Sequence, residues 1–436
     1  MSRWSSWRFC APTTGVGARH SCRFVLVVAT VVAGSITTGV KAVSPLAESL
    51  AFNPQRDDVG QLRHEAESGN ADAQFDLGVR YATGKGVTHD DTEAARWIRK
   101  AAEQGHVSAQ FSLGVMYADG NGVPQDAALA LVWLRKAADS GDARAQSNLG
   151  LIYSSGSGVP QDLEQAVTWY RKAADQGEVT AQFSLGLLYA APGHALQDPS
   201  QGAQWFRKAA DQGHALAQYN LGLMYANGAG VPQDASQAGA WFRKAADQGD
   251  AAAQFTLGRM YATGTGVERD PVQTFQWLRK AAEKGHVEAQ FSLALLYANG
   301  TGTAKDDAQA VAWYRKAADQ GSAAAQTNLG TRYATGRGVP QDAAQAVAWF
   351  RRAADHGDAS AQFNLGVMYA NGTGVSQDSI EAAKWLSLAV TRSSGADQAQ
   401  YASARDIVTA TLTRDQAAEA QRQAREWNDA HREGRR

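Results

Sequence analysis

The chain has 436 residues, with 42 Lys and Arg against 43 Asp and Glu, so its formal net charge is −1. This length exceeds the usual size of one compact core and predicts either several domains or an elongated array of repeats. Abundant Gly (43 residues) with little Pro (10 residues) is typical of short helices joined by glycine turns.

Residues 1–42 have the pattern of a secretory signal peptide. Four arginines precede an apolar run from Phe24 to Gly34, and Val40–Ala42 offers small residues where a signal peptidase would cut. We predict export to the periplasm or the medium, with an uncleaved membrane anchor as the alternative, because the weakly apolar stretch continues beyond this point. A lipoprotein is not expected, since Cys10 and Cys22 precede the apolar run.

Loss of the signal peptide would change the charge and the redox chemistry of the chain. It removes five basic residues and no acidic residue, so the net charge goes from −1 to −6. A mildly acidic chain is a poor candidate for non-specific binding to nucleic acid. Both cysteines are also removed, which excludes disulfides and thiol chemistry in the mature protein.

Residues 43–72 predict an irregular lead-in followed by a capping half-repeat. The segment Leu62–Gly69 matches the end of the second helix of the units that follow it. Such a partial unit would shield the apolar face of the first full repeat from water.

Residues 73–396 repeat one 36-residue pattern nine times without a gap. A fixed period in this range predicts stacked helix–turn–helix units, which cannot bury their apolar faces alone. The units, numbered 1 to 9 below with positions counted from the first alanine, start at Ala73, Ala109, Ala145, Ala181, Ala217, Ala253, Ala289, Ala325 and Ala361.

Aromatic residues recur at two positions of every unit. Tyr occupies position 9 from Tyr81 to Tyr369, and Trp occupies position 25 from Trp97 to Trp385. Leu at position 5 lies four residues before the Tyr, so both point to one face of the first helix. We interpret these rings as packing between neighbouring helices rather than as a platform for a cofactor or a sugar.

Turn and capping residues mark the ends of both helices. Position 18 is Asp in every unit, and Glu or Gln follows three residues later except at Leu129, which predicts a capping box at the start of the second helix. The preceding Gly-x-Gly-Val-Pro-Gln segment predicts a glycine turn. A phosphate-binding loop would need a strand before it, and none is expected. Unit 4 departs from this turn pattern over Ala191–Leu196.

The second helices carry an Arg-Lys pair at positions 27 and 28, followed by an acidic residue at position 31. This spacing predicts weak ion pairs on a solvated face rather than a basic patch.

Residues 397–436 predict C-terminal capping helices. Two helical segments are expected, Asp397–Thr411 and Thr413–Arg432. The second begins with Thr413 and has Gln416 three residues later, which is the pattern of a capping box.

The recurring pattern A-Q-x-x-L-G-x-x-Y-x-x-G-x-G-V-x-x-D…A-x-x-W-x-R-K-A-A-x-x-G resembles the Sel1-like repeat, a tetratricopeptide-like class with 36-residue units. The resemblance implies an all-α fold, an α-α solenoid wound as a right-handed superhelix with a concave groove. It also implies a scaffold or adaptor for protein complexes of the bacterial envelope. Some secreted relatives bind β-lactams or cell-wall fragments, but they carry a cysteine pair in each repeat, which this chain lacks.

No group of residues in the repeats has a pattern that predicts catalysis. His106, His214 and His286 share position 34, where other units carry Asp, Glu or Ser, so we interpret them as residues that start a helix. No pair of histidines has the short spacing of a zinc site, and no Ser, His and Asp are brought together by the pattern. We predict a protein without catalytic residues, without a cofactor and without a metal site.

The variable positions of the first helix are the candidate binding residues. Positions 4, 8 and 11 lie opposite the invariant face, where amides would bond a peptide backbone and apolar side chains would contact its side chains. The alternative is that position 8 packs between helices and the polar residues are only solvated. The candidates are Asn148, Asn220, Asn328 and Asn364 at position 4, Arg80, Arg332, Met116, Met224, Met260 and Met368 at position 8, and Asp119, Asn227, Asn299 and Asn371 at position 11.

The leading hypothesis is a non-enzymatic scaffold that binds a protein or peptide in the groove, in the envelope or after secretion. It predicts that replacing Asn220, Asn328 and Asn364 together weakens partner capture without loss of helix. The alternatives are a protein that binds cell-wall glycan or exopolysaccharide, and a hydrolase of cell-wall or β-lactam substrates. Nucleic acid and stable membrane insertion after cleavage are not expected.

Overall fold

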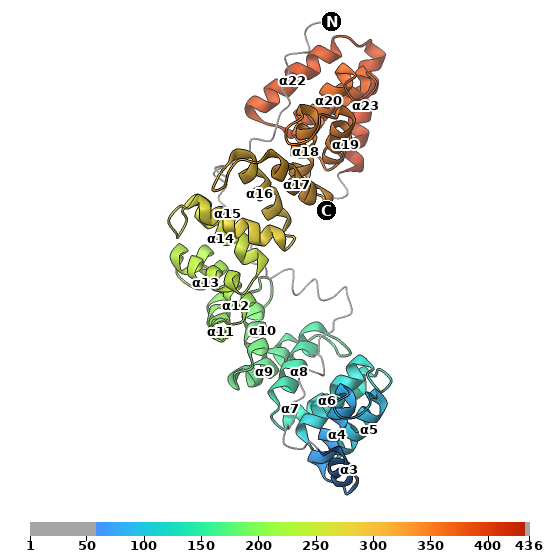
Figure 1. Cartoon of the computed structure of the whole chain (residues 1–436), viewed down its shortest axis with the longest axis vertical. Coiled ribbons are helices and arrows are strands. Elements are labelled where there is room, and N and C mark those ends of the chain that lie inside the picture. The colour runs from blue at the N-terminus through green and yellow to red at the C-terminus, as the bar shows by residue number, and fades with distance from the viewer. Residues whose placement is uncertain (1–57, 432–436) are drawn as a thin grey trace. The chain divides into compact units, whose positions relative to one another are not determined.

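The computed structural model describes residues 58–431 (Figure 1). The predicted signal peptide and the lead-in before residue 58 lie outside these residues. The described chain is helical and divides into two compact units, an N-terminal unit of residues 58–241 and a C-terminal unit of residues 242–431. The division falls within helix α13 (Ala235–Asp247).

Helices of the N-terminal unit alternate between the first and second helix of each repeat, preceded by one further helix that packs on the first repeat. Neighbouring helices in the chain pack against each other, and a second helix contacts both its own first helix and the next one. In chain order these helices are α3 (Val59–Glu67), α4 (Ala71–Thr83), α5 (Asp91–Glu103), α6 (Val107–Asp119), α7 (Ala127–Asp139), α8 (Ala143–Ser155), α9 (Leu163–Asp175), α10 (Val179–Ala190), α11 (Pro199–Asp211) and α12 (Ala215–Asn227).

The C-terminal unit continues the same alternation and ends with two helices that follow the last repeat. Helix α21 packs against both of these final helices. The helices after α13 are α14 (Ala251–Thr263), α15 (Pro271–Glu283), α16 (Val287–Asn299), α17 (Asp307–Asp319), α18 (Ala323–Thr335), α19 (Ala343–Asp355), α20 (Ala359–Asn371), α21 (Ser379–Arg392), α22 (Gly395–Thr409) and α23 (Arg414–Ala430).

The aspartates at position 18 cap the second helices, as predicted. Asp162, for example, accepts the backbone N–H of Gln165 at 2.9 Å, which satisfies a donor that has no partner inside the helix. The second half of the predicted capping box does not form there, because the Asp162 N–H donates to the carbonyl of Tyr153 in the preceding helix. Both halves are present at α23, between Thr413 and Gln416.

At several of the turns, one glycine allows two repeats to approach closely. Gly302 has φ +69°, and a Cβ added there would lie 1.9 Å from the carbonyl oxygen of Pro271 in the preceding repeat. No side chain fits at this point, so the glycine is required both for its backbone conformation and for contact.

The predicted packing of the tryptophans is confirmed. Trp169 clusters with Leu134 of the preceding second helix and Leu149 of its own first helix, and only 5% of its surface is exposed. Trp205 makes the equivalent cluster with Tyr170 and Leu188. The recurring indole therefore joins each repeat to the one before it.

Repeat 4 keeps its register despite its different turn. Helix α10 ends at Ala190, and Ala191 is extended with φ −66° and ψ 132° instead of being a left-handed glycine. Asp198 still caps α11, so the different sequence of this loop leaves the next helix in place.

Among residues 58–431, no helix has the length and apolar character that crossing a bilayer requires.

Candidate functional site

The arginines at position 27 are not merely solvated, which corrects the interpretation made from the sequence. Arg171 donates to the hydroxyl of Tyr189 in the next repeat at 2.8 Å. The two residues are 18 apart in the chain, so no local pattern indicates the bond. The same bond joins Arg63 to Tyr81, Arg99 to Tyr117, Arg135 to Tyr153, Arg207 to Tyr225, Arg243 to Tyr261, Arg315 to Tyr333 and Arg351 to Tyr369.

The lysines at position 28 contact indole rings rather than carboxylates. Lys172 Nζ lies 4.0 Å from the ring centroid of Trp169, within the range of a cation–π interaction. Within residues 58–431, the predicted pair between positions 27 and 31 forms at Arg279 and Glu283, with Nε 3.5 Å from the carboxylate. The recurring arginines thus join neighbouring repeats through the tyrosines, and the recurring lysines contact the tryptophan of their own helix.

A ladder of glutamine side chains crosses the junctions between repeats. Gln146, at position 2, donates to the carbonyl oxygen of Ala138 in the preceding helix at 3.0 Å. Its own Oε1 accepts from Gln176, at position 32, at 2.8 Å. Sequence reasoning missed this ladder, although the recurrence of Gln at positions 2 and 32 is visible in the repeats.

The ladder is incomplete where position 32 is not Gln or His. The buried Oε1 atoms of Gln110 and Gln254 accept no hydrogen bond from the described chain. Position 32 of these repeats is occupied by Ser140, which bonds the carbonyl of Lys136, and by Lys284, which bonds the carbonyl of Gly249. At these two junctions the buried glutamine Oε1 has no donor, because the residue at position 32 bonds a different carbonyl.

The histidines at position 34 start helices, as predicted. His214 Nδ1 accepts the backbone N–H of Ala217 at 3.1 Å, so this nitrogen carries no proton. The ring packs on Phe183 with a centroid distance of 4.5 Å. Burial lowers the pKa of His214, against a smaller opposing effect of Glu178. Burial also lowers the pKa of His286.

Most candidate binding residues at positions 4 and 8 are buried. Asn220 is 4% exposed and donates to the carbonyl of Leu216 in its own helix at 2.8 Å. Arg332 forms an ion pair with Asp307 of the preceding helix. Asn148 is half-buried. The other buried members are Asn328, Asn364, Arg80, Met116, Met224, Met260 and Met368.

The candidates at position 11 are exposed. Asp119, Asn227, Asn299 and Asn371 are the last residues of α6, α12, α16 and α20. Each stands where a first helix ends and its glycine turn begins. These four residues are called the helix-end row below.

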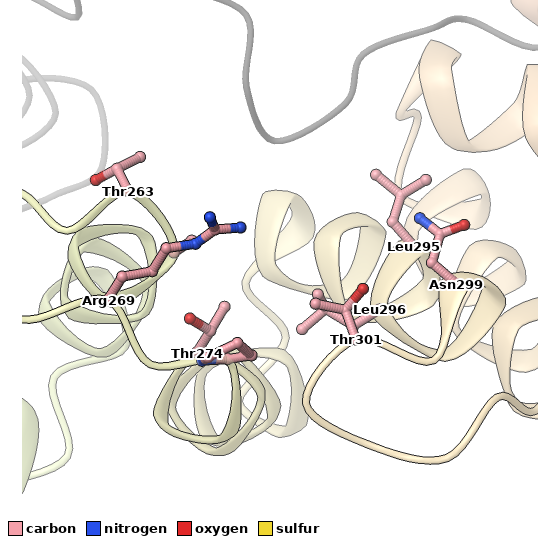
Figure 2. A pocket seen from close by; sticks show the side chains of 9 residues that line it. Thr263, Arg269, Thr274, Leu295, Leu296, Asn299 and Thr301 are labelled. Atoms are coloured by element: carbon pink, nitrogen blue, oxygen red, sulfur yellow. The ribbon is translucent and has the colours of Figure 1, made fainter.

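A cavity of about 510 Å³ lies in the C-terminal unit, between repeats 6 and 7 (Figure 2). Figure 2 shows Arg269 and Thr263 on one side and Leu295 and Asn299 on the opposite side, with their side chains bordering the space between. Asn299 belongs to the helix-end row, and Thr263 holds the equivalent position in repeat 6. The lining residues are Ala262, Thr263, Arg269, Pro271, Thr274, Leu295, Leu296, Asn299 and Thr301.

The cavity has no acidic side chain in its lining, and its aliphatic residues Leu295 and Leu296 face several hydrogen-bonding groups. It can hold a ligand through hydrogen bonds, one positive charge and apolar contact. Nowhere in residues 58–431 do three His, Cys, Asp or Glu side chains gather as a metal site would require.

Comparison with known proteins agrees with the repeat assignment. A family model described as Sel1 repeat matches residues 71–106, 107–142, 143–178, 179–214, 215–250, 251–286, 287–322, 323–358 and 359–394. A search of curated proteins finds no match.

Two solved structures are similar over most of the chain. The Sel1 repeat protein from Oxalobacter formigenes is 38% identical, with a TM-score of 0.56 over 76% of this chain and 97% of that one. The protein c5321, described as a protective antigen of uropathogenic Escherichia coli strains with an SLR fold, is 34% identical, with a TM-score of 0.50 over 85% of this chain and 94% of that one. Nine matched repeats and these neighbours establish that the chain belongs to the Sel1 repeat family, an all-helical repeat fold whose members are generally scaffolds for protein interaction.

Proposed function

We propose that this chain is a non-enzymatic scaffold that binds a segment of a partner protein at the helix-end row of the C-terminal unit, Asn299 and Asn371, outside the bacterial cytoplasm. The observation that carries the proposal is a difference between positions of the repeat, since one set of side chains makes structural contacts and another is exposed. The recurring Trp, Tyr, Arg, Lys, Gln and Asp side chains are occupied by contacts within and between repeats. Asn299 and Asn371 are exposed and their side chains make no hydrogen bond within residues 58–431, so they are available for recognition.

Exposed amide side chains suit a peptide better than a reacting substrate. Amide side chains such as Asn299 and Asn371 can both donate to and accept from a peptide backbone, as in other modes of peptide recognition. The indole rings that a glycan would stack on are buried, as at Trp169 and Trp385. Both features favour a protein partner over a carbohydrate.

The location outside the cytoplasm rests on the N-terminal pattern of basic residues followed by an apolar run. The similar protein c5321, which shares 34% identity, is described as a protective antigen. The absence of cysteine after Cys22 is compatible with an oxidising compartment, because no thiol is left to mispair.

Site-specific photo-crosslinking in the native host tests the proposal. A photoreactive amino acid replaces Asn299 or Asn371 in the full chain, and adducts are identified by mass spectrometry. We expect the same partner to be captured from both positions, because both belong to one row.

The matched control places the same amino acid at Ala312, an exposed position on the second helix α17. Capture of one partner from the row and not from Ala312 supports the proposal. Equal capture from both kinds of position, or no adduct from the row, contradicts it.

A further inference from the structure

We propose that the cavity between repeats 6 and 7 binds an aspartate or glutamate side chain of the partner segment together with an adjacent aliphatic side chain. The inference rests on the proposed function and names the peptide chemistry that one part of the row selects. It is carried by Arg269, by the residues facing it and by the departure of both repeats from the common pattern.

Arg269 is a cation without a partner. Its guanidinium forms no ion pair, hydrogen bond or ring contact with any residue of the described chain, and the side chain is exposed at the edge of the cavity. The carboxylates of the two adjacent residues form no ion pair with it. Asp270 accepts the backbone N–H groups of Val272 and Gln273, and Glu268 makes no ion pair with Arg269. A free guanidinium is suited to bidentate binding of a carboxylate.

The sequence of repeat 6 explains why this cation is free. Most repeats have Gln at position 17, where its side-chain amide donates to a carbonyl near the end of the first helix. Gln233 donates to the carbonyl of Ala226 at 2.8 Å, and Gln341 donates to that of Ala334 at 2.9 Å. Arg269 stands at this position in repeat 6 and does not bond the equivalent carbonyl of Ala262, so its side chain borders the cavity instead.

A second departure from the pattern lines the same cavity. Position 22 is Ala in seven repeats and Gly202 in repeat 4, whereas repeat 6 has Thr274. The Thr274 hydroxyl donates to the carbonyl of Asp270 at 2.8 Å, and the side chain, 2% exposed, forms part of the cavity wall. Two independent changes at one place indicate that this junction differs from the others for a reason beyond packing.

The opposite side of the cavity supplies the apolar and amide contacts. Leu295 and Leu296 are on α16, one turn before Asn299, and Thr301 follows in the glycine turn. The Asn299 and Thr301 side chains make no hydrogen bond with the described chain and are free to bond a peptide.

The composition of the cavity selects among anionic ligands. A single arginine matches the single charge of a carboxylate, whereas a phosphate group is usually met by several cations and backbone N–H groups. The two leucines favour an aliphatic neighbour over a second charge. A volume of about 510 Å³ accommodates one or two side chains and not a folded domain.

Selection from a displayed library of random heptapeptides on the full chain tests the proposal. We expect enriched peptides to place Asp or Glu next to Leu, Ile or Val. Fluorescence anisotropy then compares each peptide with its Asp→Asn or Glu→Gln form, which we expect to bind about tenfold more weakly, as is typical for the loss of a charge-assisted hydrogen bond. Hydrogen exchange should show protection of residues 263–274 and 295–301 by the acidic peptide.

Arg269→Gln is the decisive variant, because it restores the residue common at this position and is expected to fold. It should abolish the preference for the acidic form. Arg337→Gln removes the same charge from an exposed turn outside the cavity and should leave the preference intact.

The outcomes separate the two proposals. Enriched peptides that bind Arg269→Gln as well as the natural chain overturn the cavity proposal and leave the scaffold proposal standing. Failure to enrich any peptide on either chain counts against both. Equal binding of the acidic and amide forms overturns the assignment of the carboxylate.

Discussion

The junction between repeats 2 and 3 and the junction between repeats 6 and 7 are built from the same pattern but are used differently. At the first, Trp169 is packed between repeats and Arg135 bonds Tyr153. At the second, Arg279 does not bond Tyr297 but pairs with Glu283, and Arg269 is free at a cavity. Under the two proposals above, the repeated residues supply stability and the departures from the pattern supply recognition.

The largest expected effect comes from removing an indole at a regular junction. Trp169→Ala should lower the free energy of unfolding by about 3–5 kcal/mol, because the buried ring contacts two repeats and leaves a cavity when it is removed. Urea denaturation followed by circular dichroism measures this change. Trp133→Ala is the control, since that ring is only partly buried and should cost less. Equal losses for both variants would contradict the assigned role.

A stabilising change should come from completing the glutamine ladder. Ser140→Gln places an amide donor where Gln176 and Gln212 bond the position-2 glutamines of their own repeats. We expect a gain of about 0.5–1.5 kcal/mol, because the buried Oε1 of Gln110 acquires a partner.

Ser140→Ala serves as the control for the ladder, since it removes the serine without adding a donor. A gain of the same size in both variants, measured by urea denaturation, would show that the hydrogen bond to Gln110 is not the cause.

The register and the ends of the helices were predictable because they depend on local patterns. Asp at position 18 and Thr413 cap helices through contacts within three residues, and the recurring Trp follows from the need to bury an aromatic face. The reciprocal half of the capping boxes failed in the repeats because a tertiary contact, from Asp162 to the Tyr153 carbonyl, took the same donor.

The candidate site was harder to predict because burial of the first helix depends on its neighbours in space. Asn220 is polar, as most surface residues are. Its amide nevertheless bonds the carbonyl of Leu216, and the side chain is buried. The bond from Arg171 to Tyr189 spans two repeats and has no local signature. The sequence did contain a signal for the cavity. Arg269 occupies position 17, which is Gln in most repeats, and a search for residues that depart from the repeat pattern would have found it.

Conversion of the cavity corner to the regular one should separate stability from recognition. Arg269→Gln is expected to raise the free energy of unfolding by about 0.5–1 kcal/mol, because the amide can bond the Ala262 carbonyl as Gln233 bonds Ala226. The gain is smaller than at the ladder, since this corner is exposed to water. Urea denaturation beside Arg337→Gln measures it. A loss of stability would show that Arg269 is part of the packing.

The smallest expected effect is a dependence of stability on pH at the histidine caps. Burial places the pKa of His214 in the folded chain below its ordinary value, so the folded state favours the neutral ring. This contribution is fully present above the unfolded pKa of about 6.5 and is lost as the pH falls below it, because protonation of Nδ1 removes the acceptor for Ala217. His214→Asn keeps an uncharged cap, as Asn70 does for Ala73. We expect the variant to lose about 1–2 °C less in melting temperature than the natural chain between pH 7.5 and pH 5.0, with His286 accounting for part of the remaining loss. An identical loss in both chains would show that His214 does not titrate with unfolding.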